Sequence, residues 1–379
     1  MYRIFYKTEL FIGSGSLEQL KTYQNQAIFI VADPFLVQTG QLEELVETYL
    51  DSSNEIQIFS EIVPDPPIEV VVQGIQAAQG KVPQTMIAIG GGSAIDAAKA
   101  IYYFAKEQGL FEDLCFVAIP TTSGTGSEVT DFSVITDTDL GQKYPLVSRD
   151  LLPDVAILDA NLVKSLPSSI TADTGMDVLT HAFEAYVSTQ ASDFSDALAE
   201  KAVQLVFEYL PKAYRNGQDS EAREKLHAAS TLAGMAFNTA SLGINHSLAH
   251  AAGARFHIPH GRLNSILMPA VIRYNAGYQH GKIAPDCLAT AKRYQRLAQL
   301  LGYSASNPGQ GVRQLTEAVN RLQGRLKLPK TLSQYGVLSS LFQECREELA
   351  KAALVDKCSL TNPRQADVAG LLAILDASF

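Results

Sequence analysis

The sequence contains only four cysteines among its 379 residues, and no two of them form a CxxC pair. They are scattered along the chain at Cys115, Cys287, Cys345 and Cys358. This spacing fits neither a disulfide framework nor a thiolate zinc site. We therefore expect a cytoplasmic protein with reduced thiols, in which any metal site relies on histidine and carboxylate ligands.

Long apolar runs and basic clusters are also absent. No apolar run reaches the roughly 18–20 residues that a membrane-spanning helix requires. The opening stretch MYRIFYKTELFIGSG lacks the apolar centre of a signal peptide and has the alternation of a first strand. The net charge of −10, without a basic cluster, argues against nucleic acid as the main partner. We expect neither a membrane nor a nucleic-acid partner.

Short apolar runs alternate with amphipathic stretches over about the first 160 residues. The runs predict strands at 26–33, 56–63, 85–90, 115–120, 133–138 and 153–159, and the amphipathic stretches predict helices at 68–81 and 93–109. Such alternation is typical of βαβ units around a mostly parallel sheet.

Beyond Leu166 the strand-like runs disappear and Ala/Leu-rich helical patterns replace them. Apolar residues recur there at intervals of three and four, which predicts helices at 193–210, 221–240 and 286–302. We expect an α/β plus all-α architecture, with an α/β domain over 1–164 and an all-helical domain over 165–379. A cleft between two such domains is a common place for a ligand.

A glycine-rich loop follows the predicted strand at 85–90. The stretch TMIAIGGGSAIDAAKA predicts a buried strand, three glycines and a helix opened by Ser93. Glycines let backbone N–H groups approach a phosphate closely, and the helix N-terminus adds partial positive charge. Gly90 and Gly92 match the Rossmann fingerprint, but Ile95 stands where its last glycine is expected. The alternative is a tight turn that only packs strand on helix.

A second loop of small residues, PTTSGTGSEVT at 120–130, follows the next predicted strand and carries six hydroxyl groups. The carboxyl ends of parallel strands meet at one edge of a sheet, so we expect both loops to face the same crevice. Phosphate-binding backbone and sugar-binding hydroxyls together indicate a nucleotide ligand.

Four of the seven histidines fall in one short stretch, namely His246, His250, His257 and His260. Neutral imidazole is the commonest protein metal ligand. Asp177 and His181 are four residues apart, which places them on the same face of a helix. One carboxylate and three imidazoles form a suitable ligand set for Fe²⁺, Zn²⁺, Co²⁺ or Mn²⁺, with a position left for substrate.

Spacing alone leaves open whether His246 or His250 is a ligand, and it also allows Asp177 and His181 to form only a surface hydrogen bond. We expect the remaining histidines in loops, in structural positions or in solvent: His227, His257 and His280.

Four motifs in this order resemble the iron-dependent (group III) alcohol dehydrogenases: GGGSAIDAAKA, PTTSGTGSEVT, GMDVLTHAFEAYVS and HSLAHAAGARFHIPHG. The resemblance covers nearly the whole chain, including the late TNPR at 361–364. The stretches ASDFSDALAEKA and KYPL are similar to the propanol dehydrogenases of bacterial propanediol utilisation within that family. The family implies a Rossmann-like dinucleotide-binding domain followed by an all-helical metal-binding domain, the fold it shares with dehydroquinate synthase.

The resemblance also implies the roles of individual residues. It matches the metal ligands to Asp177, His181, His246 and His260, and it matches His250 to a histidine near the nicotinamide and the substrate. The family's pattern is not followed at Arg262, where a small or apolar residue is usual, or at Ala251–Ala252, where Pro-Leu is common. Both departures lie beside the metal ligands, so they leave the shape of the substrate pocket open.

The cofactor contacts implied by the resemblance lie in the first half of the chain. They are Gly91, Gly92 and Ser93 in the pyrophosphate loop, and Thr121, Thr122, Thr130 and Lys143 beyond it. Asp33 matches an acidic position that favours NAD over NADP, because a carboxylate accepts a hydrogen bond from the ribose 2′-OH and repels a 2′-phosphate. The alternative for Asp33 is an Asp-Pro turn.

The expected reaction is hydride transfer between NAD(H) and a short primary alcohol or aldehyde, with propanol and propionaldehyde foremost and ethanol or lactaldehyde/1,2-propanediol as alternatives. The metal, Fe²⁺ or else Zn²⁺, would polarise the substrate oxygen, and His250 would relay the alcohol proton. We expect a homodimer or larger homo-oligomer, in the cytoplasm or inside a bacterial microcompartment.

Three other functions are weighed against this one. They are a zinc-dependent relative of glycerol dehydrogenase or dehydroquinate synthase, a metal-dependent nucleotide phosphohydrolase, and an inactive NAD-binding scaffold. Helical phosphohydrolases often carry a His-Asp dipeptide as metal ligands, and the chain has none.

Overall fold

The computed structural model describes residues 4–111, 114–138 and 142–379. The chain divides into two compact units, Met1–Ser165 and Leu166–Phe379. Among the described residues, no helix combines the length and the apolar character needed to cross a membrane. The predicted α/β plus all-α architecture is confirmed.

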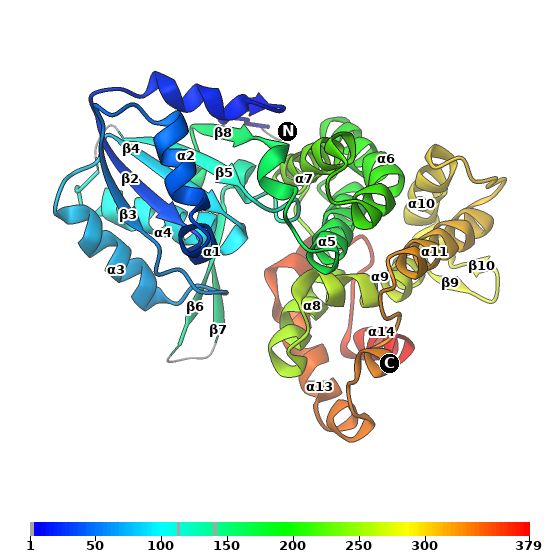
Figure 1. The fold of residues 1–379 in the computed structure, drawn as a ribbon. Helices are drawn as coiled ribbons and strands as arrows, with labels where there is room; N and C mark the ends of the chain where they lie inside the picture. Colours follow the sequence, from blue (N-terminus) through cyan, green and yellow to red (C-terminus); the bar gives the residue numbers. More distant parts are fainter. Residues whose placement is uncertain (1–3, 112–113, 139–141) are drawn as a thin grey trace. The chain divides into compact units, whose positions relative to one another are not determined.

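The first unit is built on a six-stranded sheet in which all neighbouring strands are parallel (Figure 1). Its order is β1 (Glu9–Ile12), β8 (Val155–Leu158), β5 (Cys115–Pro120), β4 (Thr85–Gly90), β2 (Ala27–Ala32) and β3 (Glu55–Phe59). Every residue of β4 is buried, because a parallel sheet is covered on both faces and its central strands are apolar throughout.

Alternate residues of each strand face opposite sides of this sheet. Phe29 and Val31 pack in one core with α3 (Ile68–Gln79) and α4 (Gly92–Glu107). Ile28 and Ile30 pack in the other with the 3₁₀ helix η1 (Ser16–Thr22), α1 (Pro34–Gln38) and α2 (Gln41–Tyr49). The sheet therefore has a helical layer on each face, and its loops are left to carry the chemistry.

Two strand predictions are wrong in detail. The strand expected at 56–63 ends at Phe59, where its pairing with β2 ends at the pair Val31–Phe59. The strand expected at 133–138 lies outside the main sheet. It is β6 (Phe132–Asp137), which pairs antiparallel with β7 (Gln142–Val147) to form a separate hairpin.

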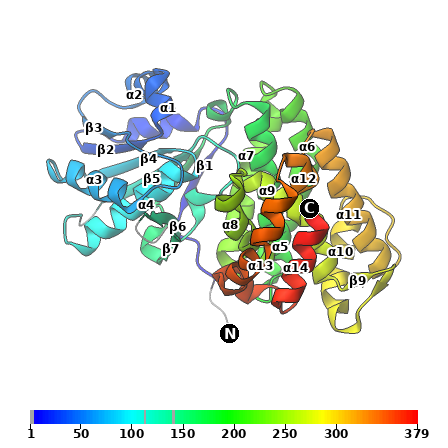
Figure 2. The same cartoon turned by 90° about the horizontal axis from the view of Figure 1, so that it is seen from below.

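The second unit is helical (Figure 2). Its helices are α5 (Ser168–Val187), α6 (Asp193–Arg215), α7 (Ser220–Ala240), α8 (Ile244–Phe256), α9 (His260–Asn275), α10 (Leu288–Leu300), α11 (Pro308–Arg325), α12 (Leu332–Tyr335), α13 (Ser339–Val355) and α14 (Val368–Ser378). The expectation that strands are absent from this half is wrong in one place. A short hairpin, β9 (Tyr278–Gln279) with β10 (Lys282–Ile283), follows α9.

Helix α5 is buried along nearly its whole length, and α6, α7 and α9 pack against it. Helix α9 joins two cores, because Met268 and Ile272 pack with α5, α6 and α7 whereas Leu267 and Val271 pack with α8, α13 and α14. The helices that carry the predicted metal ligands are thus fixed in position by apolar packing on several sides.

Candidate metal centre and nucleotide loops

Helix α5 carries a stripe of polar residues through an otherwise apolar interior. Asp173, Asp177, His181 and Glu184 are spaced by three or four residues, so they lie along one face, and all are less than 9% exposed. A buried charge is costly unless it is paired or coordinates a metal. Such a stripe therefore marks the place where this helix meets polar partners.

Helix α8 brings His246 to this stripe. The helix begins directly after Gly243, where a Cβ atom would lie 2.8 Å from Glu184 Oε1 and 2.9 Å from Asn362 Oδ1. Only glycine allows this close approach, which places His246, 1% exposed, beside α5.

Helix α9 supplies the third side of the cluster. His260 is its first residue, and its Nε2 lies 3.6 Å from Asp177 Oδ1. At the next position, Gly261, a Cβ atom would lie 2.1 Å from the carbonyl oxygen of Asp173. The glycine in the PHG sequence is therefore required for α9 to begin against α5.

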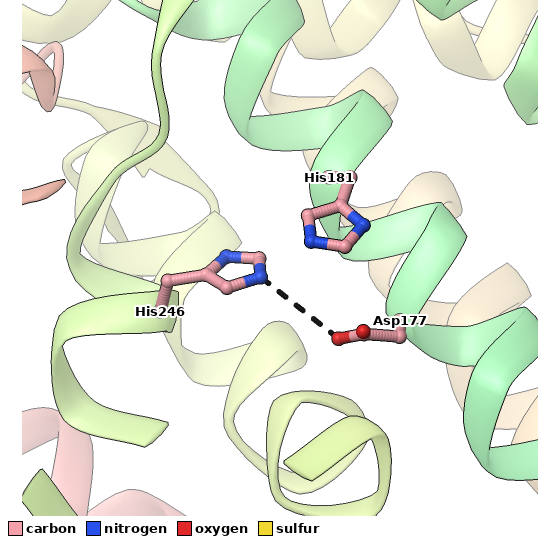
Figure 3. A group of neighbouring side chains, drawn as sticks. All are labelled: Asp177, His181 and His246. Atoms are coloured by element: carbon pink, nitrogen blue, oxygen red, sulfur yellow. Dashed lines mark ion pairs between the residues drawn. The ribbon is translucent and has the colours of Figure 1, made fainter. Parts of the chain in front are cut away.

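Asp177, His181 and His246 form a buried group whose potential ligand atoms all lie within 4.8 Å of one another (Figure 3). His246 Nε2 is 3.9 Å from Asp177 Oδ1, and the rings of His181 and His246 stack at a centroid distance of 4.6 Å. Nitrogen and oxygen ligands at about 2.1 Å from one ion lie roughly 3–3.4 Å apart, so small side-chain movements suffice to hold a divalent metal.

The protonation of the cluster suits a metal. Burial, with the neighbouring imidazoles, lowers the pKa of His246 well below its usual value, so its ring is neutral. Burial alone would raise the pKa of Asp177, but His260, His181, His246 and the amide of Asn264 lower it. A neutral imidazole and an ionised carboxylate are the forms that bind a metal.

Two residues outside the predicted ligand set orient these ligands. Glu184 Oε2 lies 2.5 Å from His246 Nδ1, which leaves Nε2 on the side of Asp177. Asn264 Nδ2 donates to Asp177 Oδ1 at 2.7 Å and lies 3.1 Å from His260 Nε2. Burial raises the pKa of Glu184 to about 7. Glu184 stands three residues after His181, and Asn264 stands four residues after His260. This helical spacing, which places each residue on the same face as a predicted ligand, is the sequence signal that could have identified both.

His250 lies one turn beyond His246 but outside the buried trio. Its Nδ1 pairs with Asp356 Oδ2 at 2.9 Å, and its ring centroid lies 6.0 Å from that of His246. Burial would raise the pKa of Asp356, but the hydrogen bond from His250 lowers it to about 2. Asp356 lies more than 100 residues from His250, and no sequence pattern indicated their pairing.

Arg262 does not project freely beside the ligands. Its Nε and Nη2 donate to the two carboxylate oxygens of Asp173 at 2.8 and 3.0 Å. The unusual arginine therefore has its own partner on α5. The remaining histidines are elsewhere: His227 is buried in α7, His257 is an exposed residue after α8, and His280 is exposed in the β9–β10 turn.

The glycine-rich loop joins β4 to α4 in the first unit. Contrary to the expectation for Ser93, the helix begins at Gly92 with Gly91 as its N-cap, because Gly91 holds the extended backbone that precedes a helix. A Cβ on Gly91 would lie 3.3 Å from Thr122, and one on Gly92 would lie 2.6 Å from Thr125. The two predicted nucleotide loops therefore touch each other directly, and glycine makes the contact possible.

The remaining predicted cofactor residues occupy different settings. The Thr121 N–H donates to the carbonyl of Gly90 at 2.9 Å, whereas Thr130 is 2% exposed and bonded to Lys99. Asp33 Oδ1 accepts from the Phe35 N–H at 2.9 Å, which makes it the N-cap of α1. The backbone of Lys143 lies in β7, and its side chain lies outside the described residues.

Comparison with known proteins identifies the family of both units. Residues 7–160 match the family described as iron-containing alcohol dehydrogenase, and residues 171–379 match the C-terminal model of the Fe-containing alcohol dehydrogenase family. The 1-propanol dehydrogenase PduQ of Salmonella typhimurium is 48% identical over 98% of both chains.

Two solved structures are similar over the whole chain. A 1,3-propanediol oxidoreductase is 31% identical, with a TM-score of 0.90 over 100% of both chains. A sulfoacetaldehyde reductase of Bifidobacterium kashiwanohense in complex with NAD⁺ is 28% identical, with a TM-score of 0.86 over 100% of this chain and 98% of that one.

These matches cover nearly the full length of these relatives as well as of this chain. They confirm the resemblance found in the four motifs and the prediction of an oxidoreductase that acts on alcohols. The chain belongs to the iron-containing alcohol dehydrogenase family.

Proposed function

We propose that this alcohol dehydrogenase transfers hydride between NAD(H) and a short primary alcohol or its aldehyde, at a divalent iron held by Asp177, His181, His246 and His260. The observation that carries the proposal is the buried carboxylate–imidazole group, whose ligand atoms lie within 4.8 Å of one another. His260, 3.6 Å from Asp177, would complete the set.

A metal bound by these four residues would act as a Lewis acid on the substrate oxygen, which stabilises the transition state by several kcal/mol. The protein keeps Asp177 ionised and His246 neutral, so both are ready to bind a cation. Glu184 Oε2 lies 2.5 Å from His246 Nδ1, and a hydrogen bond from Nδ1–H to this oxygen would direct Nε2 toward Asp177. Zinc is the alternative metal, since nitrogen and oxygen ligands accept both ions.

The proposal places the cofactor on the two loops after β4 and β5, which touch through Gly91, Gly92, Thr122 and Thr125. NAD⁺ occurs in the related sulfoacetaldehyde reductase structure, which supports the same cofactor class here. The chemistry that NAD(H) would supply at these loops is the donation or acceptance of the hydride. Asp33 follows β2 and lies beside Gly90, where a Cβ on Gly90 would be 2.9 Å from the Asp33 Cβ. A carboxylate in this place would accept a hydrogen bond from the ribose 2′-OH and repel a 2′-phosphate, which supports NAD over NADP.

We propose His250 as the catalytic proton carrier. Asp356 holds its Nδ1 at 2.9 Å, so its Nε2 is the ring nitrogen left for exchange with a substrate hydroxyl or water. The His250 side chain is one-third exposed, whereas that of His246 is almost fully buried, so His250 has access to solvent that the proposed ligand lacks.

The substrate proposed is 1-propanol or propionaldehyde, supported by 48% identity to a 1-propanol dehydrogenase. Ethanol and lactaldehyde/1,2-propanediol are the alternatives within the same reaction. We also propose that the protein is a homodimer or larger homo-oligomer, in the cytoplasm or inside a bacterial microcompartment.

The test is an anaerobic assay of purified, metal-stripped protein reloaded with Fe²⁺ or Zn²⁺. With Fe²⁺ and NADH, we expect propionaldehyde to be reduced with a higher kcat/KM than ethanal or lactaldehyde, and NADPH to be a poorer donor. If only Zn²⁺ restores activity, the metal is zinc and not iron. If none of the aldehydes causes NADH to be oxidised, the proposed substrate class is wrong.

A further inference from the structure

Lys99 is a fully buried lysine in the second half of the motif GGGSAIDAAKA, which the proposed function does not use. Its ammonium donates to the Thr130 carbonyl at 2.7 Å, to Thr130 Oγ1 at 3.0 Å and to the Phe132 carbonyl at 2.8 Å. An ammonium has three N–H donors, and all three are used on a single stretch of chain.

This arrangement is costly to maintain. Burial lowers the pKa of Lys99 to about 8, and the nearby carboxylates of Asp96, Glu128 and Asp131 offset only part of that change. An apolar residue of similar volume would avoid the cost of burying a charge. The lysine therefore has a role beyond packing. Its hydrogen bonds to Thr130 and Phe132 indicate that this role is to hold residues 130–132 in position.

Asp96 holds the same stretch from one turn earlier in α4. Its Oδ2 accepts the N–H of Val134 at 2.9 Å, its carbonyl accepts the Ser133 hydroxyl at 2.7 Å, and its Oδ1 accepts the Ser127 hydroxyl. Residues 127–134 are thus bound by one face of α4, the helix whose N-terminus forms the glycine-rich loop.

We propose that Lys99 and Asp96 are positioning residues for nucleotide binding, which hold residues 127–134 on α4 so that the second loop rests against Gly91 and Gly92. The inference builds on the proposed NAD(H) site. It gives Thr130 a structural role in place of the cofactor contact expected from the sequence. The buried hydroxyl of Thr130 accepts from Lys99 and donates to the Ser127 carbonyl at 3.4 Å. Thr130 acts as the anchor of the loop, and the part of the loop at Thr122 and Thr125, which lies against Gly91 and Gly92, contacts the cofactor.

The experiment compares Lys99→Met with Lys106→Met. Lys106 is an exposed lysine of the same helix that pairs with Asp150, so its substitution is the matched control. For Lys99→Met we expect NADH affinity, measured by fluorescence titration, to fall at least about tenfold, which corresponds to about 1.4 kcal/mol. The control should change less than about twofold. The thermal midpoint of both variants is measured alongside the affinity, because Met also leaves the carbonyls of Thr130 and Phe132 without their donor.

Amide hydrogen exchange of ligand-free protein separates the inference from the proposed cofactor site. Residues 121–134 should exchange faster in Lys99→Met than in wild type, whether or not NADH binds. If wild type fails to bind NADH, the cofactor proposal is wrong, and faster exchange would still support the positioning role. Unchanged exchange together with unchanged affinity would overturn that role.

A second variant guards against a general loss of folding. Thr130→Val removes one of the three partners and should weaken NADH binding in the same direction by a smaller factor. In a double-mutant cycle the two substitutions should be less than additive, because they remove the same bond. Full additivity, or a loss of affinity that follows a lowered thermal midpoint in every variant, would show a merely structural lysine.

Discussion

The metal centre and the nucleotide loops are built in opposite ways. The proposed metal centre depends on large polar side chains that three helices bring together, with Asp177 and His181 on α5, His246 on α8 and His260 on α9. The nucleotide loops depend on side chains that are missing, since Gly91 and Gly92 let two loops touch. Substitutions should therefore harm the first region by removing atoms and the second by adding them.

The largest effect is expected where a ligand atom is replaced. Asp177→Asn keeps the shape of the side chain but removes its charge, so bound metal should be lost and kcat/KM should fall on the order of 10³-fold, as expected for several kcal/mol of Lewis-acid stabilisation. Metal analysis and kinetics measure both. Asp196→Asn, an aspartate of α6 bonded to Arg293, is the control and should retain its metal. Full metal content in Asp177→Asn would contradict the ligand assignment.

A smaller effect is expected where a ligand is only oriented. Glu184→Gln weakens the acceptor for His246 Nδ1, so metal affinity should fall roughly 10–100-fold. Activity should then return at high Fe²⁺ concentration, unlike that of Asp177→Asn. Metal titration of stripped protein measures the change, with Glu200→Gln on α6 as control. Equal metal affinity in wild type and Glu184→Gln would show that Glu184 does not contribute to metal binding.

The nucleotide loops should respond to one added methyl group. In Gly92→Ala the new Cβ would lie 2.6 Å from Thr125, so the two loops must separate, and overpacking of this kind costs roughly 1–3 kcal/mol. We expect NADH affinity to fall about tenfold while the metal content stays at the wild-type value. Gly80→Ala, where the nearest contact would be 3.7 Å, is the control. A change in metal content instead would break the comparison between the regions.

The last prediction concerns the acid stability of the helical unit and involves no change in metal or cofactor binding. The pKa of Asp356 is lowered to about 2 from an ordinary 3.8, so its ionisation stabilises the fold above pH 4, and this contribution is lost as the pH falls toward 2. Asp356→Asn should lower the free energy of unfolding by up to about 2 kcal/mol at pH 6. Urea unfolding should show that this difference narrows below pH 4. A difference independent of pH would mean that the His250 pair adds no such stability.

Much of the molecule was predictable from residue patterns. The alternation of strands and helices predicted the parallel sheet, because a buried sheet requires continuous apolar strands with a helix between them. Spacings of four predicted which face of α5 carries Asp177 and His181, because a helix repeats every 3.6 residues. Local geometry along one element is a property of the sequence itself.

Tertiary structure decided which distant residues meet. Spacing left His246 and His250 equivalent, and the packing of α8 separated them by placing His246 against α5 and His250 against Asp356. The same holds for Lys99 and Thr130, which no local pattern connects. A contact between elements depends on how whole helices and loops pack, and periodicity within one element carries no information about that distance.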